Sequence, residues 1–208
     1  MAGNPLFVEN VANYKGRSME KMLTLPPEQM EKFRKSVSHT LEPHERGQPE
    51  AYHYTNSGTI LMRSQLDCND ARLPGTGVFD LKTRACISVR MDVENASEGA
   101  DYEIHHLTGV YNSFEREYYD MIRSAFLKYS LQVRIGHMDG IFVAYHNTKR
   151  IFGFQYIPLK EMDNAIHGSG DNDVGRREFQ FSIKLLNETL DRAVRRFPKQ
   201  VCPLLLGD

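Results

Sequence analysis

The sequence predicts an α+β domain in which a mixed β-sheet is flanked by helices. The stretch over residues 51–90 is rich in β-branched and aromatic residues separated by turn residues, a pattern typical of successive strands. Segments before and after it repeat apolar residues at helical spacing. A chain of 208 residues is long enough for one medium domain with its own core. We therefore expect a single domain over residues 1–208, with the element order α-β-β-β-α-β-β-α.

Composition and charge exclude several other classes of protein. The chain is 40% hydrophobic and contains 10 Tyr and 11 Phe, which excludes disorder as its dominant state. No stretch approaches the roughly 20 consecutive apolar residues of a membrane span. A net charge of −1 argues against a globally basic nucleic-acid coat but leaves room for a local basic groove. The three cysteines lack C-x-x-C spacing, so they indicate neither a disulfide framework nor a zinc site, and they fit a reducing compartment.

The N-terminal segment carries no targeting signal that we recognise. Residues 1–21 lack an apolar run of secretory length, and Glu9 and Glu20 are unlike the acid-poor presequence of mitochondrial import. Two alternatives follow: a cytosolic protein, or a domain taken from a longer precursor.

Helix and turn signals divide the chain into elements. A Pro-Pro pair at 26–27 suits a first helical turn, and we expect that helix to run to about residue 41, before Pro43 ends it. Ser113 opens a second helix through about residue 131. The other expected elements are a hairpin of strands 51–55 and 59–67, a loop over 69–77, a third strand over 78–90 that completes a meander, an exposed loop over 92–101, a second hairpin of strands 139–146 and 151–158, a loop over 167–175, and a helix over 177–197 with Phe181, Ile183, Leu186, Leu190 and Val194 on one side.

One group of charged residues stands out in this pattern. Because side chains alternate along a strand, Asp80, Lys82 and Arg84 share one face of the third strand. Three charged groups in line within an otherwise apolar strand are costly unless other groups compensate them. Asp67, at the end of the preceding strand, can fold back beside Asp80 if the intervening loop turns tightly.

The residue types in this group suit metal-dependent phosphate chemistry. Two adjacent carboxylates form a hard-oxygen site of the kind that Mg²⁺ prefers when phosphate completes its coordination. Lys82, one side-chain layer away, is placed to orient or help deprotonate an attacking water and to neutralise phosphate charge. The alternative is a structural cluster of ion pairs that closes the hairpin.

The spacing Asp67–x₁₂–Asp80–x–Lys82 resembles the signature of the PD-(D/E)XK nuclease superfamily. Longer strings are more specific: RSQLDC at 63–68, LPGTGVFDLKTRA at 73–85, DGIFVAYHNT at 139–148 and IFGFQY at 151–156. Together they are similar to a fungal family of membrane-associated mitochondrial proteins implicated in five-prime processing and degradation of transcripts. That family is regarded as a divergent branch of the superfamily, and the resemblance covers residues 14–198.

This resemblance implies a restriction-endonuclease-like core, a place in the mitochondrion (matrix or inner membrane) and a part in RNA processing and degradation. Carried over by residue, Asp67, Asp80 and Lys82 match the nuclease triad, with Mg²⁺ or Mn²⁺ held by the two carboxylates. The implied partners are RNA and the mitochondrial RNA polymerase or RNA-decay machinery. Family members are longer, which favours a fragment of a longer protein, and membrane association would then belong to parts outside this chain.

Several alternatives stay open at this point. Asp139, which heads a later strand, could replace Asp67 as the acidic partner, and Glu31 in the first helix is a further candidate ligand. The competing function is a non-catalytic module of the same fold that binds RNA or a protein partner. In either case the expected phosphate contacts of a local RNA groove are Arg63, Arg84 and Arg134.

Overall fold

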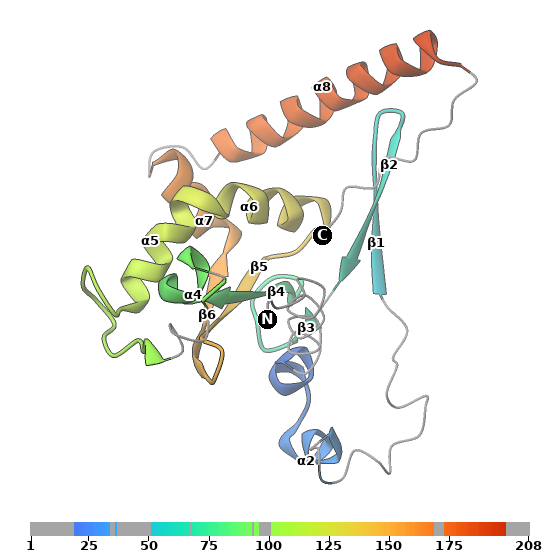
Figure 1. Ribbon diagram of the computed structural model, residues 1–208. Coiled ribbons are helices and arrows are strands. Elements are labelled where there is room, and N and C mark those ends of the chain that lie inside the picture. The colour runs from blue at the N-terminus through green and yellow to red at the C-terminus, as the bar shows by residue number, and fades with distance from the viewer. Residues whose placement is uncertain are drawn as a thin grey trace.

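The computed structural model describes residues 19–33, 36, 51–66, 68–92, 94–95, 101–168 and 173–198. It confirms the predicted α+β class, with a mixed sheet flanked by helices (Figure 1). The elements in chain order are a helix over residues 19–24, α2 (Pro27–Met30), η1 (Glu31–Phe33), β1 (Ala51–Ser57), β2 (Ile60–Leu66), β3 (Cys68–Asn69), β4 (Val78–Ala85), α4 (Ile87–Met91), α5 (Phe114–Ser124), α6 (Phe126–Ile135), β5 (Gly140–His146), β6 (Ile151–Pro158), α7 (Leu159–His167) and α8 (Val174–Arg196).

The central sheet has four strands in the order β3-β4-β5-β6. β4 is antiparallel to β3 and parallel to β5, and β5 is antiparallel to β6. A parallel pair needs a crossover connection, and here the chain passes through α4, α5 and α6 before β5 begins beside β4. The second predicted hairpin is confirmed as β5–β6.

The first predicted hairpin is also confirmed, but the predicted meander is wrong. β1 and β2 form a two-stranded sheet of their own, with Ala51 opposite Leu66 and Ser57 opposite Ile60. This hairpin stands beside the central sheet (Figure 1). The antiparallel neighbour of β4 is instead β3, which is only two residues long. A segment that short has no periodicity of its own, so the sequence does not reveal it.

The third predicted strand is shorter than expected. β4 ends at Ala85, and the residues expected to extend it form α4. The amide of Ile87 donates to the Glu117 carboxylate over 2.8 Å, and the Arg90 guanidinium donates to the Ala85 carbonyl over 2.5 Å. These bonds require a helical turn that brings both residues back over the end of the strand, which is why the strand stops.

The helices follow the predicted types but not all the predicted bounds. Ser113 caps α5 as expected, since its hydroxyl accepts a hydrogen bond from the Arg116 amide over 3.1 Å. The expected single helix is two helices, because Ala125 leaves helical geometry with a φ of −129°. In α8, Ile183 is buried but Phe181 is 65% exposed. Two residues apart on a helix means about 200° around its axis, so these side chains cannot share a side.

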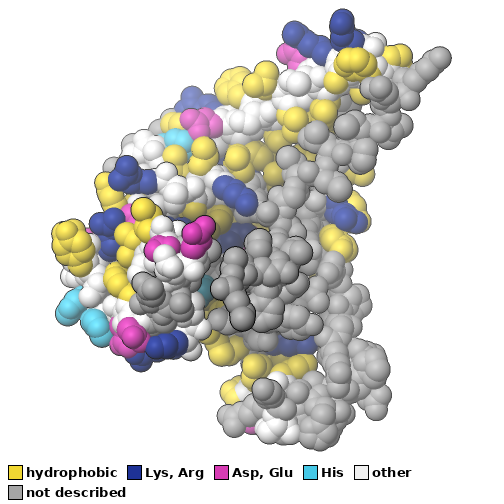
Figure 2. All heavy atoms as spheres, in the orientation of Figure 1, with side chains coloured by type: hydrophobic (Ala, Val, Ile, Leu, Met, Phe, Trp, Pro, Cys, Tyr) yellow, Lys and Arg dark blue, Asp and Glu magenta, His cyan; other side chains and the backbone are white. Residues whose placement is uncertain are grey.

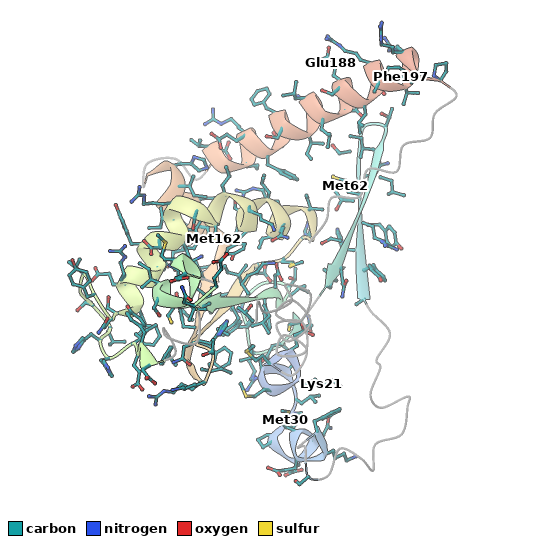
Figure 3. All side chains as sticks on the ribbon, viewed as in Figure 1. Lys21, Met30, Met62, Met162, Glu188 and Phe197 are labelled. Carbon is teal, nitrogen blue, oxygen red and sulfur yellow. The ribbon has the colours of Figure 1, made fainter. Side chains whose placement is uncertain are left out.

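Beyond its contact with the hairpin, α8 projects away from the body of the protein (Figures 1 and 3). At the hairpin tip, the Thr59 hydroxyl donates to the Asn187 amide oxygen over 2.6 Å. Val194, expected on the packing side, is exposed, as is Phe197 at the far end in Figure 3. Lys and Arg side chains gather at the same end of the helix in Figure 2.

The first predicted helix is only partly described by the structure. The first predicted helix begins at Pro27, and α2 with η1 accounts for residues 27–33. Residues 37–43, where we expected it to end, lie outside the described residues.

No helix within the described ranges has the length and apolar character needed to cross a membrane.

The central sheet separates two hydrophobic clusters. On one face, α5, α6 and α7 cover the β5 side chains Ile141 and Val143. Met162, labelled in Figure 3, is fully buried in that cluster. On the other face, Phe79 of β4 packs in a smaller cluster with Met19 of the N-terminal helix.

A fully buried carboxylate ties α5 to β4 and α4. Glu117 is paired with Arg90, and its Oε2 lies 3.9 Å from Nε of Arg84. Arg90 also reaches Asp120 over 2.9 Å. Burial, and after it repulsion from Arg90, lower the pKa of the Arg84 guanidinium. Glu117 thus lies between two guanidinium groups, and together with Asp120 it holds α5 over the end of β4.

Replacing Glu117 by Ala should lower the free energy of unfolding by about 3–5 kcal/mol, because Arg84 and Arg90 lose their shared carboxylate. The unfolding midpoint should fall by roughly 6–20 °C for a domain of this size, as measured by circular dichroism. The matched control is Glu188→Ala on α8, whose ion pair with Arg192 is exposed to solvent and should contribute at most about 1 kcal/mol. Equal midpoints for the two variants would contradict the role given to Glu117.

Candidate functional site

The face of β4 that α5 and α6 cover carries Asp80, Lys82 and Arg84, as side-chain alternation predicted. The ammonium of Lys82 lies 5.3 Å from the ring centre of Tyr129 on α6, and Arg84 faces Glu117 on α5. The row of charge is therefore enclosed between sheet and helices. Its neighbours in the parallel register of β5 are Ile141, Val143 and Tyr145.

Asp80 and Lys82 form an ion pair at the beginning of this row. Nζ of Lys82 lies 2.7 Å from Oδ2 of Asp80, and the two side chains are 21% and 7% exposed. Removal from water strengthens this attraction. The other carboxylate oxygen of Asp80 makes no hydrogen bond to any residue that the structure describes. Asp80 thus keeps one acceptor atom for a cation or a water molecule.

The predicted second carboxylate, Asp67, lies outside the described residues. Its neighbours in the chain are described: Leu66 ends β2 and Cys68 begins β3. Cys68 is opposite Phe79 in the pairing of β3 with β4, and Phe79 immediately precedes Asp80. The convergence of Asp67 with Asp80 stays a prediction.

Asp139, the alternative acidic partner, is engaged with the loop between β3 and β4. Its Oδ2 accepts hydrogen bonds from the Thr76 amide over 2.7 Å, the Thr76 hydroxyl over 2.6 Å and the Gly77 amide over 2.9 Å. Its own amide donates to the Val78 carbonyl over 2.9 Å. Asp139 therefore clamps the loop that leads into β4 against the beginning of β5.

Two glycines make this close contact possible. Gly75 and Gly77 have φ angles of +78° and +72°, a region that glycine adopts without the strain other residues meet. A Cβ on Gly75 would come within 2.4 Å of Asp139 Oδ1, and one on Gly77 within 2.6 Å of the Asp70 carbonyl oxygen. The turn at residues 74–77 therefore needs glycine at positions 75 and 77, because a larger residue would meet both an unfavourable φ and a steric clash.

The described part of the candidate metal site consists of Asp80 with Lys82 beside it. Within the described ranges, no group of three or more His, Cys, Asp or Glu side chains is arranged to hold a metal ion. Glu31 lies in η1, and its role as a further ligand stays a prediction.

The three predicted phosphate contacts lie in different surroundings. Arg84 is enclosed under α5, and Arg134 of α6 is paired with Asp163 of α7 over 2.6 Å. Both guanidinium-bearing side chains are only about a tenth exposed, so these ion pairs do not favour the predicted RNA contacts. Arg63 instead belongs to the outward side of β2, with its guanidinium 4.5 Å from the Tyr52 ring centre.

Two side chains on which this face depends, Glu117 and Tyr129, do not stand out in the sequence. Glu117 resembles any first-turn acid at a helix start, and Tyr129 resembles one more residue of an apolar stripe. A signal for Glu117 exists, because it precedes Met121 by one helical turn and so falls on the buried side of α5. Tyr129 has no such signal, since only the tertiary fold brings an ammonium group to its ring.

Comparison with known proteins places this chain in a family. A family model described as "Mitochondrial protein Pet127" matches residues 5–191. The chain belongs to the Pet127 family. The predicted mitochondrial location is confirmed by this membership, whereas the choice between matrix and inner membrane stays a prediction.

Two curated fungal members of the Pet127 family are similar to this chain. The "mRNA degradation protein pet127, mitochondrial" of Schizosaccharomyces pombe is 46% identical over 194 residues, which cover 92% of this chain and 36% of that protein. The "Putative mitochondrial translation system component PET127" of Saccharomyces cerevisiae is 58% identical over 123 residues, which cover 58% of this chain and 15% of that protein. The matched regions thus make up about a third of the first protein's length and less of the second's.

Among solved structures, Rai1 of Scheffersomyces stipitis in complex with (3′-NADP)⁺ and calcium ion aligns with a TM-score of 0.40. The alignment has 11% sequence identity and covers 86% of this chain and 50% of that chain. A likeness of this degree carries no weight for fold or chemistry. The restriction-endonuclease-like character of the core therefore stays a proposal.

Replacing Asp139 by Ala should loosen the loop between β3 and β4, because three hydrogen-bond donors lose their acceptor. The free energy of unfolding should fall by about 1–3 kcal/mol, and the amides of Thr76 and Gly77 should exchange faster in hydrogen-exchange measurements. The control is Asp101→Ala, which removes an exposed carboxylate paired with Lys149 and should change neither quantity. Unchanged exchange at Thr76 and Gly77 in Asp139→Ala would rule out the clamp.

Proposed function

We propose that this chain is a nuclease-like domain of a longer mitochondrial RNA processing and degradation factor, and that it hydrolyses phosphodiester bonds with Mg²⁺ or Mn²⁺. The observation that carries the proposal is the enclosed Asp80–Lys82 pair on β4. The strand beside it, β3, begins one residue after Asp67. The names of the two relatives, which refer to mRNA degradation and to translation in mitochondria, support RNA as the substrate class.

The donor atoms suit a divalent cation. Carboxylate oxygens are the ligands that Mg²⁺ and Mn²⁺ prefer, and one oxygen of Asp80 has no donor within the described part of the chain. Asp67 would supply the second carboxylate, with phosphate and water completing the coordination. Two carboxylates brought together without a cation repel one another, so this pair favours cation binding.

Each side chain of the site has a separate role in the proposed hydrolysis. A bound cation stabilises the negative charge that develops on the phosphate oxygens and makes water more acidic. Lys82 has three N–H donors, of which Asp80 takes one over 2.7 Å. The other donors orient the attacking water and neutralise a phosphate oxygen. Tyr129 restricts where the ammonium can move, because its ring lies 5.3 Å away on the α6 side.

The alternative is a non-catalytic module that binds RNA or a protein partner, such as the mitochondrial RNA polymerase or the RNA-decay machinery. The same ion pair favours it, because Lys82 neutralises Asp80 without any cation. Cleavage and metal binding therefore separate the two functions.

Purified protein, labelled single-stranded RNA and Mg²⁺ test the proposal directly. The wild type should cleave the RNA, and Asp80→Asn and Lys82→Ala should each slow cleavage by roughly 100-fold or more, because each removes a group that acts on the reacting phosphate. The matched control is Asp101→Asn, since Asp101 is also paired with a lysine, Lys149, but at the exposed surface. Cleavage by Asp80→Asn at the wild-type rate, or no cleavage by the wild type, would overturn the proposal.

Metal binding should be measurable as a gain in stability against unfolding, whether or not the protein cleaves RNA. At a hundred times its Kd, Mn²⁺ should raise the free energy of unfolding of the wild type by about 2.7 kcal/mol, which is roughly 5–10 °C in the unfolding midpoint. Asp80→Asn should not respond, because it lacks the charged donor. A wild type indifferent to Mn²⁺, together with an Asp80→Asn variant destabilised by about 3 kcal/mol or more, would decide for a purely structural ion pair.

A further inference from the structure

The outward face of the β1–β2 hairpin exposes aromatic side chains. Burial alternates along both strands, and the exposed set includes Tyr52, Tyr54 and Leu61, with exposed fractions of 37%, 58% and 70%. The two tyrosines are neighbours on one face of β1, about 6.8 Å apart along the strand. This spacing is about twice the 3.4 Å separation of stacked bases, so one nucleic-acid strand can contact both rings.

Arg63 supplies positive charge to the same face. It is opposite Tyr54 in the register, and its guanidinium lies 4.5 Å from the Tyr52 ring centre. It is the only Lys, Arg, Asp or Glu within residues 51–66. Within the described part of the chain it makes no ion pair with a carboxylate. The face thus combines two rings with a positive charge, and no acidic group of the hairpin repels phosphate.

Hydrogen bonds from its inward side and from its tip hold the hairpin against neighbouring helices. The Thr55 hydroxyl donates to the Ile135 carbonyl at the end of α6 over 3.0 Å. At the tip, Thr59 donates to Asn187 of α8 over 2.6 Å. A surface held in this way loses little conformational freedom when a ligand binds.

This face lies close to the candidate site along the chain. Arg63 precedes Asp67 by four residues, which span at most about 14 Å, or roughly four stacked nucleotides. β2 also contacts β4, the strand that carries Asp80. An RNA strand several nucleotides long is therefore long enough to contact both the hairpin face and the candidate site.

We propose that Tyr52, Tyr54 and Arg63 form a platform that binds single-stranded RNA, with bases stacked on the tyrosines and a phosphate paired with Arg63. Stacking on aromatic rings tolerates every base, and unpaired bases can stack in this way whereas those inside a duplex cannot. Aromatic rings and a guanidinium that pairs with no carboxylate of the described residues match the two chemical parts of a nucleotide, which favours RNA over a protein partner. The inference rests on the proposed function for its ligand class and adds that the substrate enters as a single strand.

Binding measured in EDTA tests the platform apart from the metal site. In fluorescence anisotropy with labelled oligoadenylate RNA, Tyr54→Val should weaken binding about fivefold or more, because one stacked base is lost. Valine keeps the β propensity of the position, and Tyr54→Phe, which keeps the ring, should bind like the wild type. Arg63→Gln should reduce the slope of log K against log salt by about 0.7, as expected for one phosphate contact on a single strand.

The chain offers a matched control in α5. Tyr119 is 53% exposed, and the Arg123 guanidinium lies 5.8 Å from its ring centre, so it repeats the Tyr–Arg combination away from the hairpin. Tyr119→Val should bind RNA like the wild type. An oligoribose phosphate that lacks bases should bind wild type and Tyr54→Val equally.

The platform is overturned if folded Tyr54→Val binds oligoadenylate like the wild type, or if the base-free polymer binds the wild type as tightly as RNA. Preference for duplex over single-stranded RNA would overturn it as well. Absence of RNA binding would reassign the hairpin face to a protein partner. Failure of the nuclease proposal has a different signature: the wild type and Asp80→Asn would bind RNA alike, with the dependence on Tyr54 intact, and neither would cleave it in Mg²⁺.

Discussion

Charged side chains on the helix-covered face of β4 have to be neutralised where they lie, and the arrangement of the surrounding helices follows from that requirement. Arg84 is enclosed beside Glu117, which has no exposed surface and also pairs with Arg90. If α5 moved away, it would leave two guanidinium groups in apolar surroundings without their carboxylate, a cost that packing alone does not repay. The parallel pairing of β4 with β5 adds to the constraint, because it sets the same charged row beside apolar side chains of β5.

The charged residues at the two ends of β4 have different surroundings. At the end of the strand, the guanidinium of Arg84 faces the buried Glu117 carboxylate over 3.9 Å, and Glu117 also binds α4 through Ile87 and Arg90. At the beginning, Asp80 has Lys82 as partner and one oxygen without a protein donor in the described part of the chain. The loop before it is fixed by Asp139, which accepts three hydrogen bonds through a single oxygen. One strand thus joins a buried cluster of ion pairs at one end to an ion pair at the other end with an acceptor atom left for a ligand.

The hairpin adds a second surface to this site. Hydrogen bonds hold its inward side to the end of α6 and its tip to α8, whereas its outward side presents tyrosines and Arg63 to solvent. Because β2 leads directly toward Asp67, the exposed face and the enclosed charges are successive parts of one stretch of chain. The matched regions make up about a third or less of the curated Pet127 proteins, so this stretch is one portion of the surface that a whole Pet127 protein presents.

The sequence by itself determined the α+β class, both hairpins, the cap at Ser113 and the shared face of Asp80, Lys82 and Arg84, because each depends on local rules: turn residues, capping and the alternation of a strand. The resemblance that it carries also gave the family. Only the tertiary structure decided that β4 pairs with β3 and β5 rather than with β2, that residues 87–91 turn into a helix, and that Asp139 clamps a loop. It likewise enclosed Arg84 and Arg134 in ion pairs while leaving Arg63 on an outward face. Strand pairing and ion pairing join residues that are far apart in the chain. The free energy of such a contact depends on which groups meet and on how much water is removed from them. A local sequence pattern contains neither kind of information.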